Sequence, residues 1–161
     1  MKTLSPLKTL LLASAIGFAL TGCQESAQDT AADVADARAD GQEDVANAEA
    51  NARETAAETR QDLNAASTDA IADANAGVNA AGAVYNEAVA DATELNAAAR
   101  YDVAIVKATA EYTVAKERCE ALAGAERDAC MTVAKSDHEM AKLEAEKARD
   151  LANAAADARR E

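Results

Sequence analysis

Residues 23–161 contain no proline and only four glycines, so almost nothing in this stretch interrupts a helix. Alanine occupies 44 of these 139 positions, and it combines the highest helix propensity with very little side chain to bury. The sequence has a single phenylalanine, Phe18, and no tryptophan, so a thick globular core cannot be built. The composition therefore predicts an all-α fold of long, thin, alanine-rich helices.

The first residues predict export from the cytoplasm. Lys2 and Lys8 precede a mostly apolar run at residues 10–20, which is too short to cross a hydrocarbon core of about 30 Å as a helix. The run leads into the sequence Leu20-Thr21-Gly22-Cys23, which resembles the lipobox of bacterial lipoprotein signals. In that family a diacylglycerol is attached to the cysteine, and the chain is cleaved before it.

The resemblance implies that residues 1–22 are a signal peptide and that acyl chains on Cys23, palmitate among them, form a membrane anchor. Two or three such chains attach a protein to a bilayer almost permanently. Sorting in this family retains lipoproteins with Asp after the cysteine in the inner membrane, whereas position 24 here is Gln. The expected location is therefore the periplasmic face of the outer membrane.

The net charge of −13 becomes −15 once Lys2 and Lys8 are removed, and this acidity disfavours binding to nucleic acid. No glycine-rich phosphate loop, serine elbow or calcium loop is present, and His138 is the only histidine. We therefore expect no catalytic residues, no metal site and no cofactor.

A weak repeat begins near residue 32, where ADVADARADGQ at residues 32–42 is followed by EDVANAEANAR at residues 43–53. A period of eleven residues gives a nearly straight helical stripe, here mostly Ala. Larger side chains enter the stripe only occasionally, at Val34, Val45, Leu63 and Ile71. The pattern resembles the repeats of late-embryogenesis-abundant stress proteins and the alanine seam of murein lipoproteins. A solvated helix that forms only in part is the alternative for residues 28–76.

Gly77 and Gly82 lie within six residues of each other, and each costs about 1 kcal/mol relative to Ala inside a helix. This segment is therefore interpreted as a hinge or a frayed junction. It divides the expected mature chain into a lipid-anchored, partly disordered helical stalk at residues 23–80 and a helical hairpin at residues 83–161.

The second part contains an apolar seam that needs a partner. Its positions follow spacings of four and three: Tyr101, Ile105, Ala108, Tyr112, Ala115, Cys119 and Leu122. A second, less regular apolar face is expected further on, at Cys130, Val133, Ala134, Met140, Ala141, Leu143, Ala148 and Leu151. The same chain folded back is the expected partner of the seam, and a second copy of the chain is the alternative.

Cys119 and Cys130 would lie about 16 Å apart on one unbroken helix, whereas bridged Cα atoms lie about 4.4–6.8 Å apart. A disulfide therefore requires the chain to reverse between them. Gly124 suits a left-handed residue that ends a helix, and Glu126 and Asp128 suit the first turn of the next. An exported chain favours pairing, with a bridge between chains, free thiols or a redox pair as alternatives.

This region resembles a group of uncharacterised alanine-rich exported proteins of proteobacteria, which have a Cys-x10-Cys hairpin. The matching positions are Lys116, Glu117, Cys119, Leu122, Gly124, Cys130, Ala134 and Lys135. The resemblance implies a hairpin and carries no activity.

Three tyrosines and the histidine are the remaining candidates for a site. Tyr101 and Tyr112 lie on the seam, where packing is their expected role, and Tyr85 lies outside it. His138 is expected to be a seam or surface residue.

The resulting prediction is a non-enzymatic, lipid-anchored envelope protein that acts as a structural spacer or an interaction module. Its expected partners are the membrane, through Cys23, and envelope proteins or the cell wall through non-covalent contact. The alternative is a stress-protective, partly disordered helical protein that shields membranes or client proteins.

Overall fold

The computed structural model describes residues 26–77 and 80–161. These residues form three helices: α1 (Ala27–Asn75), α2 (Ala81–Glu120) and α3 (Gly124–Arg160). The all-α fold and the C-terminal antiparallel hairpin are confirmed. None of the described helices combines the length and the apolar composition needed to cross a bilayer.

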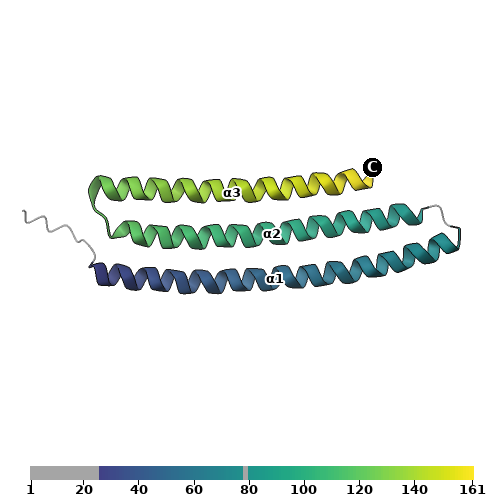
Figure 1. The fold of residues 1–161 in the computed structure, drawn as a ribbon, viewed down its shortest axis with the longest axis horizontal. Coiled ribbons are helices and arrows are strands. Elements are labelled where there is room, and N and C mark those ends of the chain that lie inside the picture. The colour runs from purple at the N-terminus through teal and green to yellow at the C-terminus, as the bar shows by residue number, and fades with distance from the viewer. Residues whose placement is uncertain (1–25, 78–79) are drawn as a thin grey trace, which may run out of the picture.

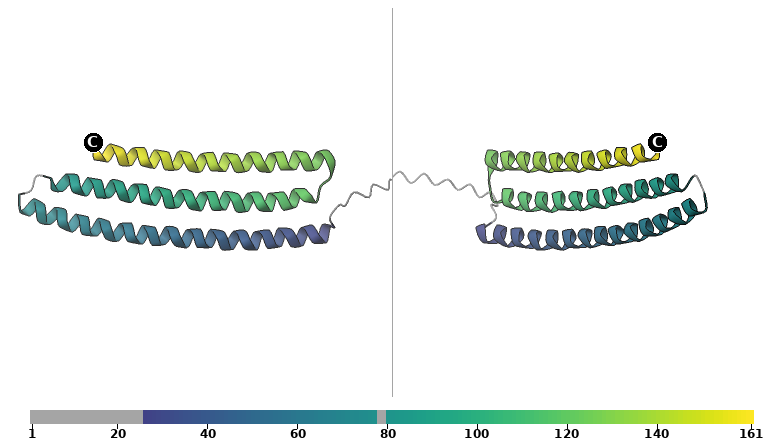
Figure 2. Two further views of the ribbon diagram at one scale, coloured as in Figure 1. Left: turned by 180° about the vertical axis from the view of Figure 1, so that it is seen from behind. Right: turned by 45° about the vertical axis from the view of Figure 1, so that its right-hand side comes forward.

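The three helices lie side by side with α2 in the middle, so each helix runs antiparallel to its neighbour (Figure 1). α2 packs against both α1 and α3, whereas α1 and α3 do not touch within the described residues. The further views keep this order, with the three helices curving gently together (Figure 2). The protein is therefore an open layer and not a closed bundle. Within the segment predicted as a stalk, residues 23–80, α1 is packed along α2.

The eleven-residue period of α1 sets the side that packs on α2. Ser26 caps the helix by accepting a hydrogen bond from the backbone N–H of Asp29 at 3.2 Å. The residues of α1 that are buried or partly buried form a stripe of three series, each with a spacing of eleven residues. The series are Thr30, Gly41, Ala52 and Leu63; Val34, Val45 and Ala56; and Ala37, Ala48, Thr59 and Ala70. Val34, Val45 and Leu63 are thus in the stripe as predicted. The prediction that Ile71 belongs to the stripe is wrong. The covered position is its neighbour Ala70, and the side chain of Ile71 is 61% exposed.

The same period appears on the middle helix. Ala97, Ala108 and Cys119 are buried at eleven-residue intervals on the side of α2 that carries the disulfide to α3. The opposite side approaches α1 so closely that a Cβ added to Gly41 would lie 2.7 Å from the Cβ of Ala110. Small side chains on both sides of α2 therefore bring the helices close together.

The predicted apolar face of α3 is wrong in its large residues. Val133, Met140, Leu143 and Leu151 are each more than half exposed. The buried positions are Ala134, Ala145 and Ala156, again at eleven-residue intervals. An alanine side allows α3 to lie closer to α2 than a side of leucine and methionine would. The side of α3 that is buried is therefore the one that lets α3 lie closest to α2.

Both predicted breaks separate helices. α1 ends at Asn75, and Gly77 follows with φ at +82°. At the other turn Gly124 has φ at +56°, which confirms the left-handed residue expected there. Gly124 opens α3, however, because α2 already ends at Glu120; Glu126 falls in the first turn and Asp128 beyond it.

Candidate functional site

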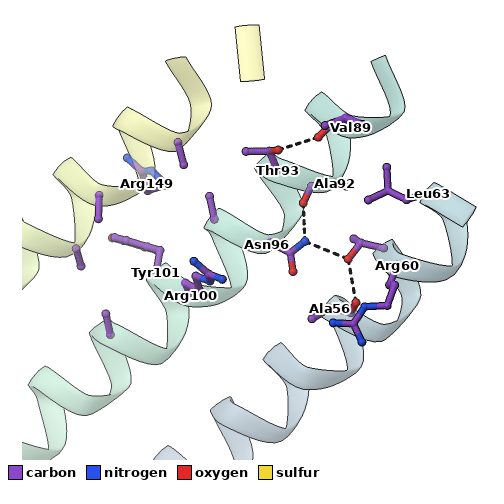
Figure 3. A pocket seen from close by; sticks show the side chains of 16 residues that line it. Ala56, Arg60, Leu63, Val89, Ala92, Thr93, Asn96, Arg100, Tyr101 and Arg149 are labelled. Atoms are coloured by element: carbon purple, nitrogen blue, oxygen red, sulfur yellow. Dashed lines mark hydrogen bonds between the residues drawn. The ribbon is translucent and has the colours of Figure 1, made fainter. Parts of the chain in front are cut away.

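A groove of about 570 Å³ lies across one face of the layer and is lined by all three helices (Figure 3). The middle helix contributes Val89, Ala92, Thr93, Asn96, Ala97, Arg100, Tyr101 and Ala104. The flanking helices contribute Ala56, Thr59, Arg60 and Leu63 from α1, and Ala145, Ala148, Arg149 and Ala152 from α3. The groove exists because alanines along α2 leave a depression between the two outer helices.

A short chain of hydrogen bonds fixes one wall of the groove. The Asn96 side-chain amide donates to the hydroxyl of Thr59 at 3.1 Å and to the carbonyl of Ala92 at 2.7 Å. The Thr59 hydroxyl donates in turn to the carbonyl of Thr55 at 2.9 Å. Figure 3 shows Asn96 reaching from α2 towards α1. These bonds hold α1 and α2 in register beside the groove.

The charged side chains that line the groove are all arginines, one from each helix: Arg60, Arg100 and Arg149. Among the described residues no Asp or Glu lines it, although the sequence has 29 acidic residues against 16 basic ones. The groove is thus a basic site on an acidic protein.

The three arginines differ in how they are held. The guanidinium of Arg149 lies 4.7 Å from the ring centre of Tyr101 and donates to Asp150 at 2.8 Å. The hydrogen bond to Asp150 raises the pKa of Arg149 above its usual value. Arg60 and Arg100 are exposed and make no ion pair or hydrogen bond with any described residue. Two guanidinium groups are therefore free to bind a ligand.

A second cluster lies towards the disulfide end of the hairpin. Cys119 and Cys130 are joined within one chain, with Cα atoms 5.6 Å apart. His138 stacks on Tyr112 with ring centres 4.8 Å apart and an angle of 14° between planes. The Nε2 atom of His138 is buried and has no hydrogen-bond partner among the described residues. This cluster joins α2 to α3. Its four residues line none of the five grooves found among the described residues.

The remaining predicted residues are dispersed. Tyr101 packs under Arg149 on the seam, whereas Tyr85 is 39% exposed near the α1–α2 turn. The predicted lipidation residue Cys23 lies outside the described residues. In the part of the chain that the structure describes, no group of three His, Cys, Asp or Glu side chains could hold a metal ion.

Sequence reasoning did not find the arginine groove. Arg60, Arg100 and Arg149 are 40 and 49 positions apart and belong to no local motif. Only the pairing of the helices brings them to one face. The available signal was their nearness in sequence to buried positions: Arg60 comes one position after the buried Thr59, and Arg149 comes four positions after the buried Ala145.

Comparison with known proteins gives no relative from which a function can be transferred. No protein-family model matches the chain, and neither a curated protein nor a solved structure is similar to it at a significant level. The geometry and the sequence therefore carry the functional argument alone.

Proposed function

We propose that this chain is a non-enzymatic envelope protein, anchored by lipid on Cys23 to the periplasmic face of the outer membrane, that acts as a structural spacer or an interaction module. The observation that carries the proposal is the shape of the described residues. α1 alone has 49 residues, which at 1.5 Å per residue is roughly 74 Å of helix. With α2 and α3 packed alongside, the layer is long enough to act as a spacer and has two broad faces on which a partner could bind.

The position of the lipobox supports this proposal. Cys23 precedes the first residue of α1, Ala27, by four positions, so the anchor would be attached at one end of the layer. Envelope proteins, or the cell wall through non-covalent contact, would then meet the faces of the helices. The strongly acidic composition disfavours nucleic acid as a partner.

Anchoring is tested by producing the full-length chain and its Cys23→Ser variant in a Gram-negative host and separating membrane from soluble fractions. We expect the full-length chain in the membrane fraction and the variant in the soluble periplasmic fraction, because only the cysteine can carry the acyl chains. A Cys23→Ser variant that stays with the membrane would contradict lipid anchoring.

The spacer role is separated from the stress-protective alternative by circular dichroism of the chain from residue 24 onward in dilute buffer. A spacer should be strongly helical there and should unfold cooperatively with heat. A protective, partly disordered protein should be poorly helical in water and gain helix only on drying or on membranes. The second result would replace the spacer with the protective role.

A further inference from the structure

The arginine groove has a positive charge, whereas the protein as a whole is strongly acidic. The sequence carries a net charge of −13, yet the groove is lined by three arginines and no carboxylate. On an acidic helix surface an exposed arginine can be neutralised by a nearby carboxylate, as at Glu49 and Arg53, whose charged groups are 2.7 Å apart. Arg60 and Arg100 depart from that pattern, because neither forms an ion pair with a described residue, whereas Arg149 has Asp150 beside it at 2.8 Å.

The contacts of the three arginines leave them able to bind a ligand. Arg149 is positioned in advance, because its guanidinium lies against Tyr101 and is held from the side by Asp150. Arg60 and Arg100 keep all their donors free of other described residues. A guanidinium group presents paired N–H donors whose geometry matches a carboxylate or a phosphate.

The floor of the groove suits the carbon part of a ligand. Ala92, Ala97, Ala104 and Ala145 line the groove with methyl groups. The volume of about 570 Å³ lies within the range of about 300–1,000 Å³ that is usual for small-molecule sites. Asn96 and Thr59 already bond to each other, so this wall is fixed before a ligand arrives.

We propose that the groove binds a small organic oxyanion, a carboxylate or a phosphate, with its charged oxygens on Arg60, Arg100 and Arg149 and its carbon skeleton on the alanine floor. The inference goes beyond the structural role proposed above and does not depend on it. Binding is measured on the purified chain, whereas the envelope role is tested in cells.

The test is titration calorimetry of the chain from residue 24 onward with citrate and, separately, with glycerol 3-phosphate at low ionic strength. We expect at least one anion to bind, and the stronger of the two identifies carboxylate or phosphate as the group recognised. Arg60→Gln and Arg100→Gln should each weaken binding by about tenfold, the value of one lost charged hydrogen bond. Added salt should weaken binding as well.

Arg127→Gln is the matched control, because Arg127 is an exposed arginine of α3 that does not line the groove. The affinity of the Arg127→Gln variant for each anion should equal that of the unchanged chain. The proposal is overturned if neither anion binds or if the control loses as much affinity as the groove variants. It is also overturned if sedimentation shows a dimer that only Arg60→Gln and Arg100→Gln dissociate, because the groove then holds carboxylates of a second copy.

Discussion

The two interfaces of the layer are built differently. Between α2 and α3 lie a disulfide, the Tyr112–His138 stack and the contact of Arg149 with Tyr101. Between α1 and α2 the structure has one side-chain hydrogen bond, from Asn96 to Thr59, and among the described residues no disulfide, ion pair or ring contact. One interface is cross-linked, whereas the other depends on the close approach of small residues.

This difference indicates how alanine-rich helices can associate without large side chains. An alanine buries little apolar area, so each contact contributes little to stability. α1 compensates by length and by an eleven-residue period that keeps the same side against α2 over 49 residues. The shorter α3 has 37 residues and relies on a cross-link and on specific side-chain contacts.

The largest expected effect comes from opening the cross-link. The chain from residue 24 onward contains only Cys119 and Cys130, so the Cys119→Ser, Cys130→Ser double variant removes the disulfide alone. We expect a loss of about 3 kcal/mol in the free energy of unfolding, measured by urea denaturation, because the unfolded chain is no longer closed into a loop.

Hydrogen exchange then localises the effect of opening the cross-link. Amides of α3 should exchange faster in the double variant, whereas those of the α1–α2 interface should change less. Equal acceleration in all three helices would mean that the layer unfolds as one unit and that the two interfaces are not independent.

A smaller effect should follow from adding one methyl group to the α1–α2 interface. In Gly41→Ala the new Cβ lies 2.7 Å from that of Ala110, so α1 and α2 must separate. Gly82→Ala is the matched control, because no described residue lies within 4 Å of its added Cβ. Both variants gain helix propensity, so we expect Gly41→Ala to be less stable than Gly82→Ala by about 1–3 kcal/mol in urea denaturation. Equal stability would show that close approach does not hold this interface.

The smallest effect concerns the end of α3, where Arg160 donates hydrogen bonds to Asp91 at 2.7 Å and to Glu94. The hydrogen bond with Arg160 lowers the pKa of Glu94 below its ordinary value of 4.5. The contribution of this pair to stability is therefore complete above pH 4.5 and is lost as the pH falls through the lowered pKa.

Thermal unfolding of Arg160→Gln tests this contribution. We expect a small decrease in Tm at pH 7 that disappears in acid, because the groups are exposed and such pairs contribute little. The neighbouring Arg159→Gln removes an exposed charge that forms no ion pair with a described residue, so it should leave Tm unchanged. An Arg160→Gln decrease that persists in acid would assign the effect to packing of the side chain.

Much of the fold could be predicted from the sequence because it depends on local signals. The scarcity of Gly and Pro predicts long helices, and Gly77 and Gly124 mark the turns with their positive φ. The repeat at residues 32–53 gives the period of the buried stripe of α1. These features follow from propensity and backbone conformation, which depend on neighbouring residues alone.

The parts that could not be predicted depend on which helix packs where. α1 has a stripe of small residues that could face water, and its packing on α2 rests on a fit with Ala110 that no local pattern reveals. On α3 the large residues were expected inside, but alanine is buried in their place because it allows closer approach. The arginine groove depends on both interfaces and was therefore beyond the reach of sequence analysis.

The course of the chain has a mechanical consequence. α1 begins at the end of the layer where α2 turns into α3, and α3 finishes near the opposite end (Figure 1). A tension applied between the start of α1 and the end of α3 acts along the helix axes, so it would slide the helices past one another and not peel them apart. Sliding must disrupt many small contacts at once, which makes an interface of individually weak alanines resistant to pulling in this direction.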